Sequence, residues 1–287
     1  MLDTPATHAK QHVRLRYSTR KTDSTLNIVV TIKQVADPNI PPSHIQLDAD
    51  EKRIISPPGI APVMNGYDAN ALEEALRLRD THGGTVTVIS LGEETSRDTL
   101  KRAAAMGANT AVLLSDPEWR HADSANVGQL IAAGIRKSGP CDLVLCGRQA
   151  SDTDGGQVLH WVARNLGLPV ITPVTKIESV EGDTLTVQRL TDDGVQRLKI
   201  KLPALLGISS EMNEPRLPSM RGLMSAGRVM IPVWKKNDLT VQLPAPRVEL
   251  RKLAIQIRKS KAEMIPGKTG AEQGAALADK LREQGLI

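Results

Sequence analysis

The amino-acid sequence predicts an α/β fold in which a doubly wound, mostly parallel sheet carries helices on both faces. The main observation is that, between residues 26 and 172, short β-branched runs alternate with segments that repeat apolar residues at helical spacing. This alternation is typical of parallel sheets, because each helix returns the chain to the end where the next strand begins. A second observation is that 40% of the residues are hydrophobic, which is enough for a core. Because Phe is absent, that core must consist of Leu, Ile, Val, Ala and Met.

The first half of the chain is expected to start with a strand at 26–33 (LNIVVTIK). The Pro-rich stretch 38–62 predicts a small β-hairpin or irregular excursion, in which 45–47 and 53–55 flank a polar turn. Asp68 is expected to cap a helix that ends at His82, before Gly83-Gly84. The pattern then predicts a strand at 85–91, a helix from Thr95 or Ser96 to near Gly107, a strand at 110–114, a helix at 123–138, a strand at 142–146, a helix at 157–166 and a strand that begins at 169–172.

The pattern changes at Val174. Short strands are expected at 176–179, 184–190 and 196–201, with hairpin turns at 181–183 and 192–194, before 204–208 returns to the main sheet. A basic, Pro-containing stretch (228–269) and an amphipathic helix (271–284) follow. We therefore expect three parts, namely a basic N-terminal extension (1–25), an α/β nucleotide-binding domain (26–227) and an extended C-terminal arm with a helix (228–287).

The positive charge gathers in two segments. Residues 1–25 hold five Lys or Arg against two Asp, and residues 221–261 hold ten Lys or Arg against one Asp and one Glu. Such segments favour an acidic protein surface or a second subunit as partner. Nucleic acid is the alternative, but no nucleic-acid motif accompanies the charge. We expect the extension 1–25 to be a tail or peripheral arm, with a transit peptide as the alternative.

Several classes of protein are disfavoured. No run of about 18 apolar residues predicts a membrane span. Cys141 and Cys146 lack metal-ligand spacing and favour a reducing compartment. There is no G-x-G-x-x-G after the first strand and no Walker loop, and no catalytic set of Ser, His, Asp or Cys is recognisable. Of the six His, His160 alone is expected near a binding loop. Because no catalytic set is recognisable, we expect no catalytic residues.

The stretch from Gly147 to Gln157 is the strongest candidate for a ligand site. It follows the strand predicted at 142–146 and leads into a helix, and open parallel sheets bind ligands beyond the carboxyl ends of their strands. Small and polar residues there expose backbone N–H groups at a helix N-terminus, which favours a phosphate. Asp152 and Asp154 would repel a phosphate at short range, so we expect them to cap the helix, bind ribose hydroxyls or order the loop.

A second stretch, 213–224, combines a Pro-stiffened loop with Met220 and a short helix. An exposed Met suits adaptable protein contacts. A helix cap packed on the core explains the pattern equally well.

Four motifs make the chain resemble the β subunit of electron transfer flavoproteins (ETFs). The resemblance runs from residue 27 to 227 and more weakly to the end. The motifs are the first strand with Lys33 (VVTIKQV), the turn and helix start 64–68 followed by 71–78, the loop 147–154, and the stretch 190–208 that continues into 213–216.

The resemblance implies an electron-carrier subunit and no enzyme activity of its own. An ETF is a heterodimer whose α subunit holds most of the FAD in a mobile domain, while the β subunit buries an AMP and recognises flavin dehydrogenases such as acyl-CoA dehydrogenases. Electrons then pass to an acceptor like the ETF-quinone oxidoreductase. The C-terminal arm would wrap the α subunit, which favours a protein partner over nucleic acid. We expect a cytoplasmic protein of a bacterium or archaeon, with the mitochondrial matrix as the alternative.

The resemblance also implies two sets of site residues. A partner-recognition loop would use Arg216, Leu217, Met220 and Leu223. The nucleotide would be bound by Thr31, Asn65, Gly66, Tyr67, Asp68, Leu91, Gly147, Arg148, Gln149, Ala150, Ser151, Asp152, Thr153, Asp154, Gly155, Gly156, Gln157 and Val158.

A departure from the family pattern leaves an alternative open. Electron-bifurcating relatives bind a second FAD and use NADH, with a loop that ends like D-G-D-T-A-Q-V-G-P. This chain keeps Gln157-Val158 but has Leu159-His160 in place of Gly-Pro. AMP is therefore the expected nucleotide and a second FAD the alternative. Outside the family, a stand-alone adenine-nucleotide-binding module and a nucleotide-hydrolysing enzyme are the competing hypotheses.

Overall fold

The computed structural model describes residues 25–255 and 262–287 of the 287-residue chain. The described residues fall into two separately compact units that divide between Leu253 and Ala254. The predicted extension 1–25, apart from Thr25, lies outside the described residues, and so do residues 256–261 of the predicted arm.

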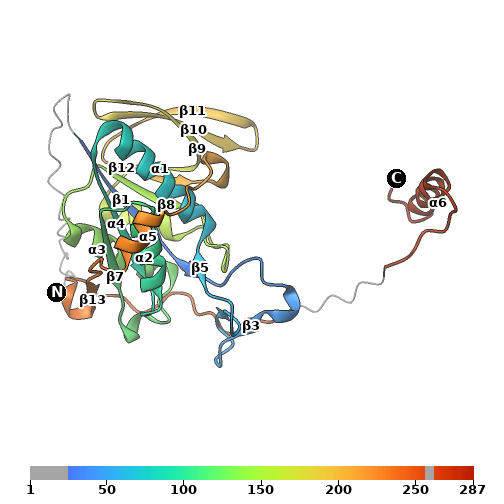
Figure 1. The fold of residues 1–287 in the computed structure, drawn as a ribbon, viewed down its shortest axis with the longest axis horizontal. Helices are drawn as coiled ribbons and strands as arrows, with labels where there is room; N and C mark the ends of the chain where they lie inside the picture. The colour runs from blue at the N-terminus through green and yellow to red at the C-terminus, as the bar shows by residue number, and fades with distance from the viewer. Residues whose placement is uncertain (1–24, 256–261) are drawn as a thin grey trace, which may run out of the picture. The chain divides into compact units, whose positions relative to one another are not determined.

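The first unit is built on a nine-stranded sheet (Figure 1) with the order β11-β10-β9-β12-β8-β1-β6-β7-β13. Seven strands pair in parallel from β9 to β13, and β10 and β11 add an antiparallel hairpin at one edge. The strands are β1 (Leu26–Ile32), β6 (Gly84–Leu91), β7 (Thr110–Leu114), β8 (Leu143–Gly147), β9 (Val170–Glu181), β10 (Thr184–Thr191), β11 (Gly194–Lys201), β12 (Ala204–Ile208) and β13 (Val233–Trp234).

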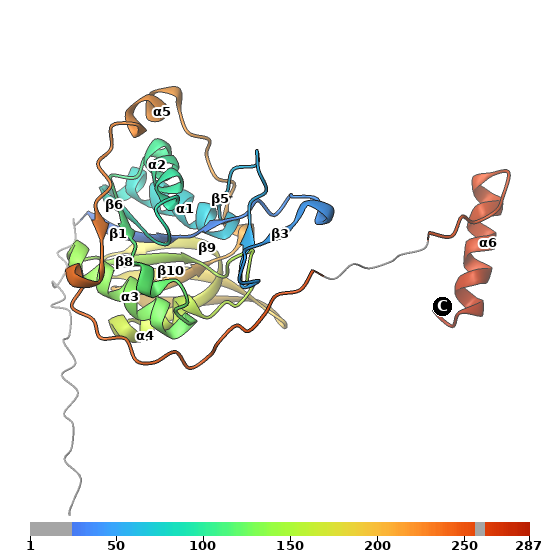
Figure 2. The same cartoon turned by 90° about the horizontal axis from the view of Figure 1, so that it is seen from below.

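Helices cover both faces of this sheet (Figure 2). Helices α1 (Gly66–His82) and α2 (Ser96–Met106) lie on one face, and α3 (Ser124–Ser138) and α4 (Val158–Leu166) lie on the other. The predicted doubly wound, mostly parallel α/β fold is therefore confirmed.

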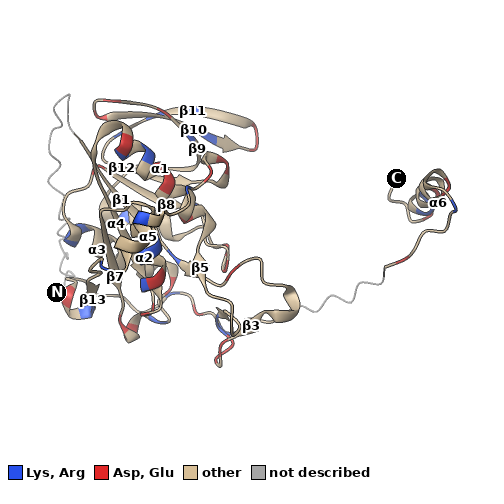
Figure 3. Cartoon of the chain, viewed as in Figure 1, with Lys and Arg blue, Asp and Glu red and all other residues tan. Residues whose placement is uncertain are grey.

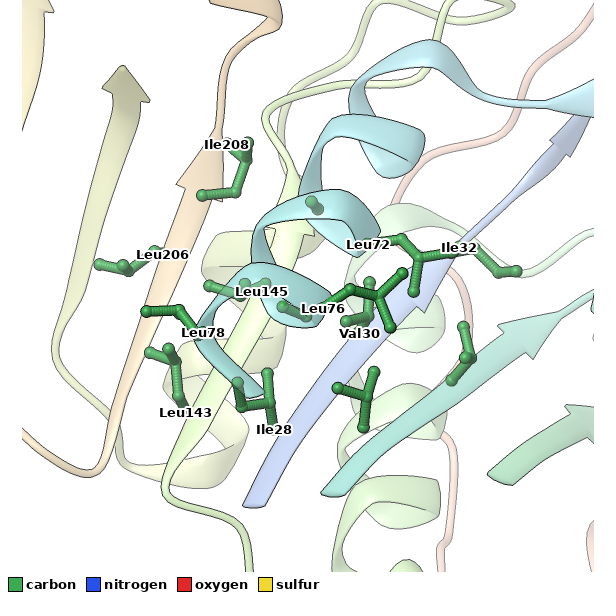
Figure 4. Packing of buried hydrophobic residues seen from close by; sticks show 14 of the residues in the cluster. Ile28, Val30, Ile32, Leu72, Leu76, Leu78, Leu143, Leu145, Leu206 and Ile208 are labelled. Atoms are coloured by element: carbon green, nitrogen blue, oxygen red, sulfur yellow. The ribbon is translucent and has the colours of Figure 1, made fainter. Parts of the chain in front are cut away.

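Successive side chains of the central strands point to opposite faces of the sheet and so form two apolar clusters. Ile28, Val30 and Ile32 of β1 face α1, whereas Val29 belongs to the cluster under α3 and α4. Figure 4 shows Leu72 and Leu76 of α1 packed over β1 and β8. Apart from Trp119, the buried apolar side chains in the described residues are aliphatic or sulfur-containing, as the composition requires.

The Pro-rich excursion contains the predicted hairpin. Strand β3 (Gln46–Leu47) pairs antiparallel with β4 (Ile54–Ile55), and β2 (Gln34–Val35) pairs with β5 (Val63–Met64) where the excursion leaves and rejoins the sheet unit. The largely buried carboxylate of Asp48 forms ion pairs with Arg53 and Arg120 and accepts backbone N–H groups, so the hairpin is held electrostatically. The described part of the unit also has four short 3-10 turns, at Pro42–His44 (η1), Pro117–Trp119 (η2), Ser210–Met212 (η3) and Lys236–Asp238 (η4).

Two strands and the role of one residue differ from the prediction. Strand β9 is one twelve-residue strand in place of two short ones, because its carboxyl half pairs with β10 after its start pairs with β12. Strand β13 was not predicted, and it adds to β7 in parallel. Asp68 is not the helix cap. Asn65 precedes α1, and the Asp68 side chain makes tertiary contacts instead.

Two helices lie in the C-terminal third. Helix α5 (Met220–Ala226) is capped by Ser219, whose hydroxyl accepts the N–H of Gly222. Helix α6 (Gly270–Glu283) belongs to the second unit and is capped by Thr269. None of the helices in the described ranges is long and apolar enough to cross a membrane.

Candidate functional site

The chain reverses its direction of travel across the sheet between β1 and β8. It runs outward from β1 through β6 to β7 and then crosses to β8 on the other side of β1. Such a topological switch point separates the loops at the carboxyl ends of the two strands and leaves a place for a ligand. The loop 147–157 begins here, directly after β8, as the sequence predicts.

Two buried side chains from the start of α1 hold this loop at alternate residues. Asn65 Nδ2 donates to the carbonyl of Gln149 (2.8 Å), and Asn65 Oδ1 accepts the N–H of Ser151 (3.1 Å). Asp68 Oδ1 accepts the N–H of Gly147 (3.1 Å). The beginning of the loop is therefore positioned by side chains at the start of α1.

Asp68 also reaches the end of β1, where its Oδ2 accepts the N–H of Lys33 (2.8 Å). The side chain is almost wholly buried, with 6% exposed. Burial raises the pKa of this carboxyl to about 7, although the hydrogen bonds from Lys33 and Gly147 oppose the rise. Strong perturbation of this kind is typical of functional sites.

Ion pairs and hydrogen bonds order the exposed part of the loop. Lys33 Nζ lies 2.7 Å from the carboxylate of Asp152, and the amide of Gln149 donates to Asp154. Asp154 itself has a positive φ of 52° and donates its N–H to the carbonyl of Ala150 (2.8 Å). The two loop aspartates therefore order the loop, which is one of the roles that the sequence analysis assigns them.

The beginning of α4 offers an anion site. No side chain caps this helix, and among the described residues no acceptor is found for the backbone N–H groups of Gly155, Gly156, Gln157 and Val158. Four such N–H groups at a helix N-terminus suit a phosphate. Lys33, which follows the neighbouring strand β1, carries a positive charge that pairs with Asp152 of the loop.

Arg148 gives a second sign of a missing ligand. Its guanidinium lies 5.2 Å from the ring centroid of Tyr67, and its Nε is buried with no hydrogen-bond partner among the described residues. Buried polar groups are normally paired, so this nitrogen fits an acceptor supplied by a bound group.

The remaining predicted residues lie along the same edge of the sheet. Thr31 on β1 is in register with Cys146 on β8, and Leu91 is the last residue of β6. Gly66 begins α1, and Thr153 lies at the exposed turn of the loop. His160 is exposed on α4. No group of His, Cys, Asp and Glu within the described ranges could hold a metal ion.

A separate apolar surface lies on and beside α5. Its residues are Leu217, Met220, Leu223 and Met224, all exposed. Helix α5 packs closely on α2, since a Cβ on Gly222 would lie 2.1 Å from the carbonyl oxygen of Ala105.

The loop before α5 is fastened to α1 by polar contacts. Arg216 forms ion pairs with the buried Glu73 (2.8 Å) and with Asp80 (3.0 Å), and Asn213 donates to Glu74 (3.1 Å). Acidic and basic residues are interspersed along α1 (Figure 3), which allows these pairings. Arg216 is thus engaged within the chain, whereas the apolar side chains that follow it are free to meet a partner.

Residues 59–239, more than half of the chain, match the family described as the electron transfer flavoprotein domain. The chain belongs to the electron transfer flavoprotein beta-subunit family. It is 37% identical to the electron transfer flavoprotein subunit beta of Clostridium acetobutylicum, a match that covers 91% of this chain and all of that protein. Membership of this family supports a role in electron transfer.

Two further relatives have more specific names. The chain is 35% identical to the caffeyl-CoA reductase-Etf complex subunit CarD of Acetobacterium woodii, over 91% of this chain and 100% of that protein. It is 34% identical to protein FixA of Azorhizobium caulinodans, over 90% of this chain and 95% of that protein.

Sequence reasoning missed two features of this ETF-family site. Lys33 was noted only as part of a motif, although its ammonium group holds Asp152. The hydrogen bonds from the side chains of Asn65 and Asp68 to the backbone of the loop were also missed. No local pattern signals them, because the backbone partners of these two side chains are 35 to 86 residues away in the sequence.

Proposed function

We propose that this chain is the β subunit of a heterodimeric ETF and that its switch-point site holds an AMP. The observation that carries the proposal is the set of unpaired N–H groups at the start of α4. They match the hydrogen-bonding capacity of one phosphate group, and Lys33, which follows the neighbouring strand β1 and pairs with Asp152 of the loop, adds a cation at the same edge of the sheet. The unpaired, buried Nε of Arg148 supports a further acceptor in the same place.

In this proposal the chain binds the nucleotide and positions partners but carries out no redox chemistry itself. FAD, held mainly by the α subunit, carries the electrons. Asn65 and Asp68 fix the loop, the N-terminus of α4 and Lys33 bind phosphate, and Tyr67 with Arg148 borders the site. The exposed surface on α5 is where a flavin dehydrogenase would dock, and electrons would leave to a quinone-reductase-type acceptor.

A second FAD in the same site is the alternative, with electron bifurcation from NADH as its consequence. The retained Gln157-Val158 pair supports it. So does the similarity to a relative whose name places it in a complex with caffeyl-CoA reductase.

Nucleotide content tests the proposal. The chain is co-expressed with the α subunit from the same source, and the purified complex is denatured and its FAD and AMP are quantified by chromatography. One FAD and one AMP per heterodimer are expected. If the complex contains two FAD and no AMP, the nucleotide at this site is a second flavin and not AMP. A complex with neither AMP nor a second flavin would overturn the proposal.

A further inference from the structure

The carboxylate of Asp68 joins the carboxyl ends of two neighbouring parallel strands. One oxygen accepts the N–H of Lys33 after β1, and the other accepts the N–H of Gly147 at the end of β8. We infer that Asp68 is a proton-sensitive positioning residue, which sets the separation of these two strand ends and so the affinity of the site for its nucleotide. This inference rests on the proposed function, because it assumes that a nucleotide binds between these ends.

Only a carboxylate suits this position. Two N–H donors from different strands converge on one side chain, and an ionised carboxylate accepts at both oxygens. An amide accepts at one atom and would turn its own N–H group toward the second donor. A protonated carboxyl also keeps only one good acceptor, so one strand end is released in either case.

Asp68 has little left to offer a ligand directly. It is buried, and each of its oxygens already accepts a backbone N–H. It therefore acts through the backbone on either side of the site. Gly147 continues into the loop that ends at α4, and Lys33 carries the ammonium group that pairs with Asp152.

The burial of Asp68 places its protonation in the neutral range, since the pKa of the carboxyl is raised to about 7. The charged group that faces it from β1 is Lys33, which favours the ionised form. From β8 the facing group is Cys146, whose pKa burial raises to about 12, so that it stays a neutral thiol. Tyr67 and Arg148 flank the pair of hydrogen bonds, and Asp152 is held by Lys33.

Ionisation of Asp68 has opposite effects on folding and on nucleotide binding. A carboxyl whose pKa is higher in the folded chain than in the unfolded chain makes the folded state less stable as pH rises toward that value. Ionised Asp68 is therefore a cost to folding at neutral pH. Loss of its charge should weaken nucleotide binding without weakening the fold, and a purely structural residue would not behave in this way.

The test measures nucleotide retention by the complex with the α subunit after dialysis at about pH 8 and about pH 6, on either side of the relevant pKa. The variant is Asp68→Asn. The matched control is Asp142→Asn, because Asp142 accepts the N–H of Asn27 (2.8 Å) at the opposite ends of the same two strands. A single N–H can still be accepted by an amide oxygen there.

We expect the wild-type complex to retain AMP, or a second FAD, at the higher pH and to release it faster as pH falls through the neutral range. Asp68→Asn should release the nucleotide about tenfold faster at the higher pH, as loss of a charge-assisted hydrogen bond predicts, with little further change on acidification. Its melting temperature at the higher pH should be unchanged or raised. Asp142→Asn should follow the wild type.

The failures of the two proposals are distinguishable. A wild-type complex that never contains a nucleotide at this site overturns the proposed function. A wild-type complex that holds its nucleotide equally at both pH values overturns the role of Asp68 alone, even where Asp68→Asn gives no folded complex. Wild-type retention by Asp68→Asn, or the same acid dependence in that variant, also overturns it.

Discussion

Gly147 is the residue at which the site tolerates no side chain. A Cβ there would lie 2.3 Å from Asp68 Oδ1 and 2.8 Å from Tyr67 Cβ, so the loop would have to leave the first turn of α1. The glycine is needed for this close approach, since its φ lies outside the positive range.

We predict that Gly147→Ala destabilises the chain by about 1–3 kcal/mol, the usual cost of overpacking, and lowers nucleotide content. Urea unfolding and chromatography of the released nucleotide measure the two effects. Gly227→Ala is the control, because a Cβ at Gly227 would meet nothing within 4 Å and Gly227 lies at the end of α5, outside the site. Equal behaviour of the two variants would contradict the close approach of the loop to α1.

At single positions, sequence reasoning located the loop after β8 but not every role of the residues around it. The loop 147–157 was recognisable because small and polar residues follow a buried strand. Asp68 was expected to cap a helix, since Asp is common there, but burial among distant backbone N–H groups decided its role instead. Whether each of these residues contacts a nucleotide stays a prediction.

Helix α5 is the element through which a partner is expected to dock. Its apolar side chains face outward, and Met220 is 77% exposed. A short helix held on α2 and preceded by a loop fastened to α1 presents them in a fixed arrangement.

We predict that Met220→Ala lowers kcat/KM for electron transfer from the dehydrogenase by about tenfold, as truncation of an interface anchor does, without loss of bound flavin. Steady-state kinetics and the flavin absorbance measure these quantities. Met230→Ala is the control, because Met230 is also highly exposed but lies outside α5. Unchanged kinetics for Met220→Ala, or an equal effect of Met230→Ala, would contradict a docking role for α5.

The length of each element governed how well it was predicted. Strands β7 and β12 were predicted from their apolar runs, because a buried parallel strand is continuously hydrophobic. Strand β13 comprises two residues after Pro232 in a basic stretch, and no periodicity can mark so short a segment. Its existence depends on the edge of β7, which is far away in the sequence.

For the whole molecule, the fold class was predictable because strand–helix alternation and crossover rules leave few topologies. The point at which the C-terminal part separates from the sheet unit was not predictable. Residues 228–253 are compact with the sheet unit, with Ile231 and Leu239 buried in it, whereas Ala254–Ile287 forms a unit of its own. Basic residues continue across this division, from Arg251 and Lys252 to Arg258, Lys259 and Lys261, so composition does not mark it.

Two truncations follow from this division. Ending the chain after Leu253 should leave the free energy of unfolding unchanged within about 0.5 kcal/mol and reduce heterodimer formation, if the last unit binds the α subunit. Ending it after Gly227 should cost about 3–6 kcal/mol, because two buried apolar side chains are lost with β13. Urea unfolding of the chain and titration with the α subunit measure both.

Equal destabilisation by the two truncations would contradict the division at Leu253. Full heterodimer formation by the chain that ends at Leu253 would instead contradict the role of Ala254–Ile287 in assembly, and would leave the division intact.

The pairing of β13 with β7 also bears on how the chain leaves the ribosome. The N–H groups of Leu113 and Ser115 donate to the carbonyls of Pro232 and Trp234, which are synthesised long afterwards. Until then, β7 presents an open edge to which a strand of another nascent chain can add. The late segment therefore covers an edge at which chains can associate, and a chain that ends after Gly227 should aggregate more readily than one that ends after Leu253.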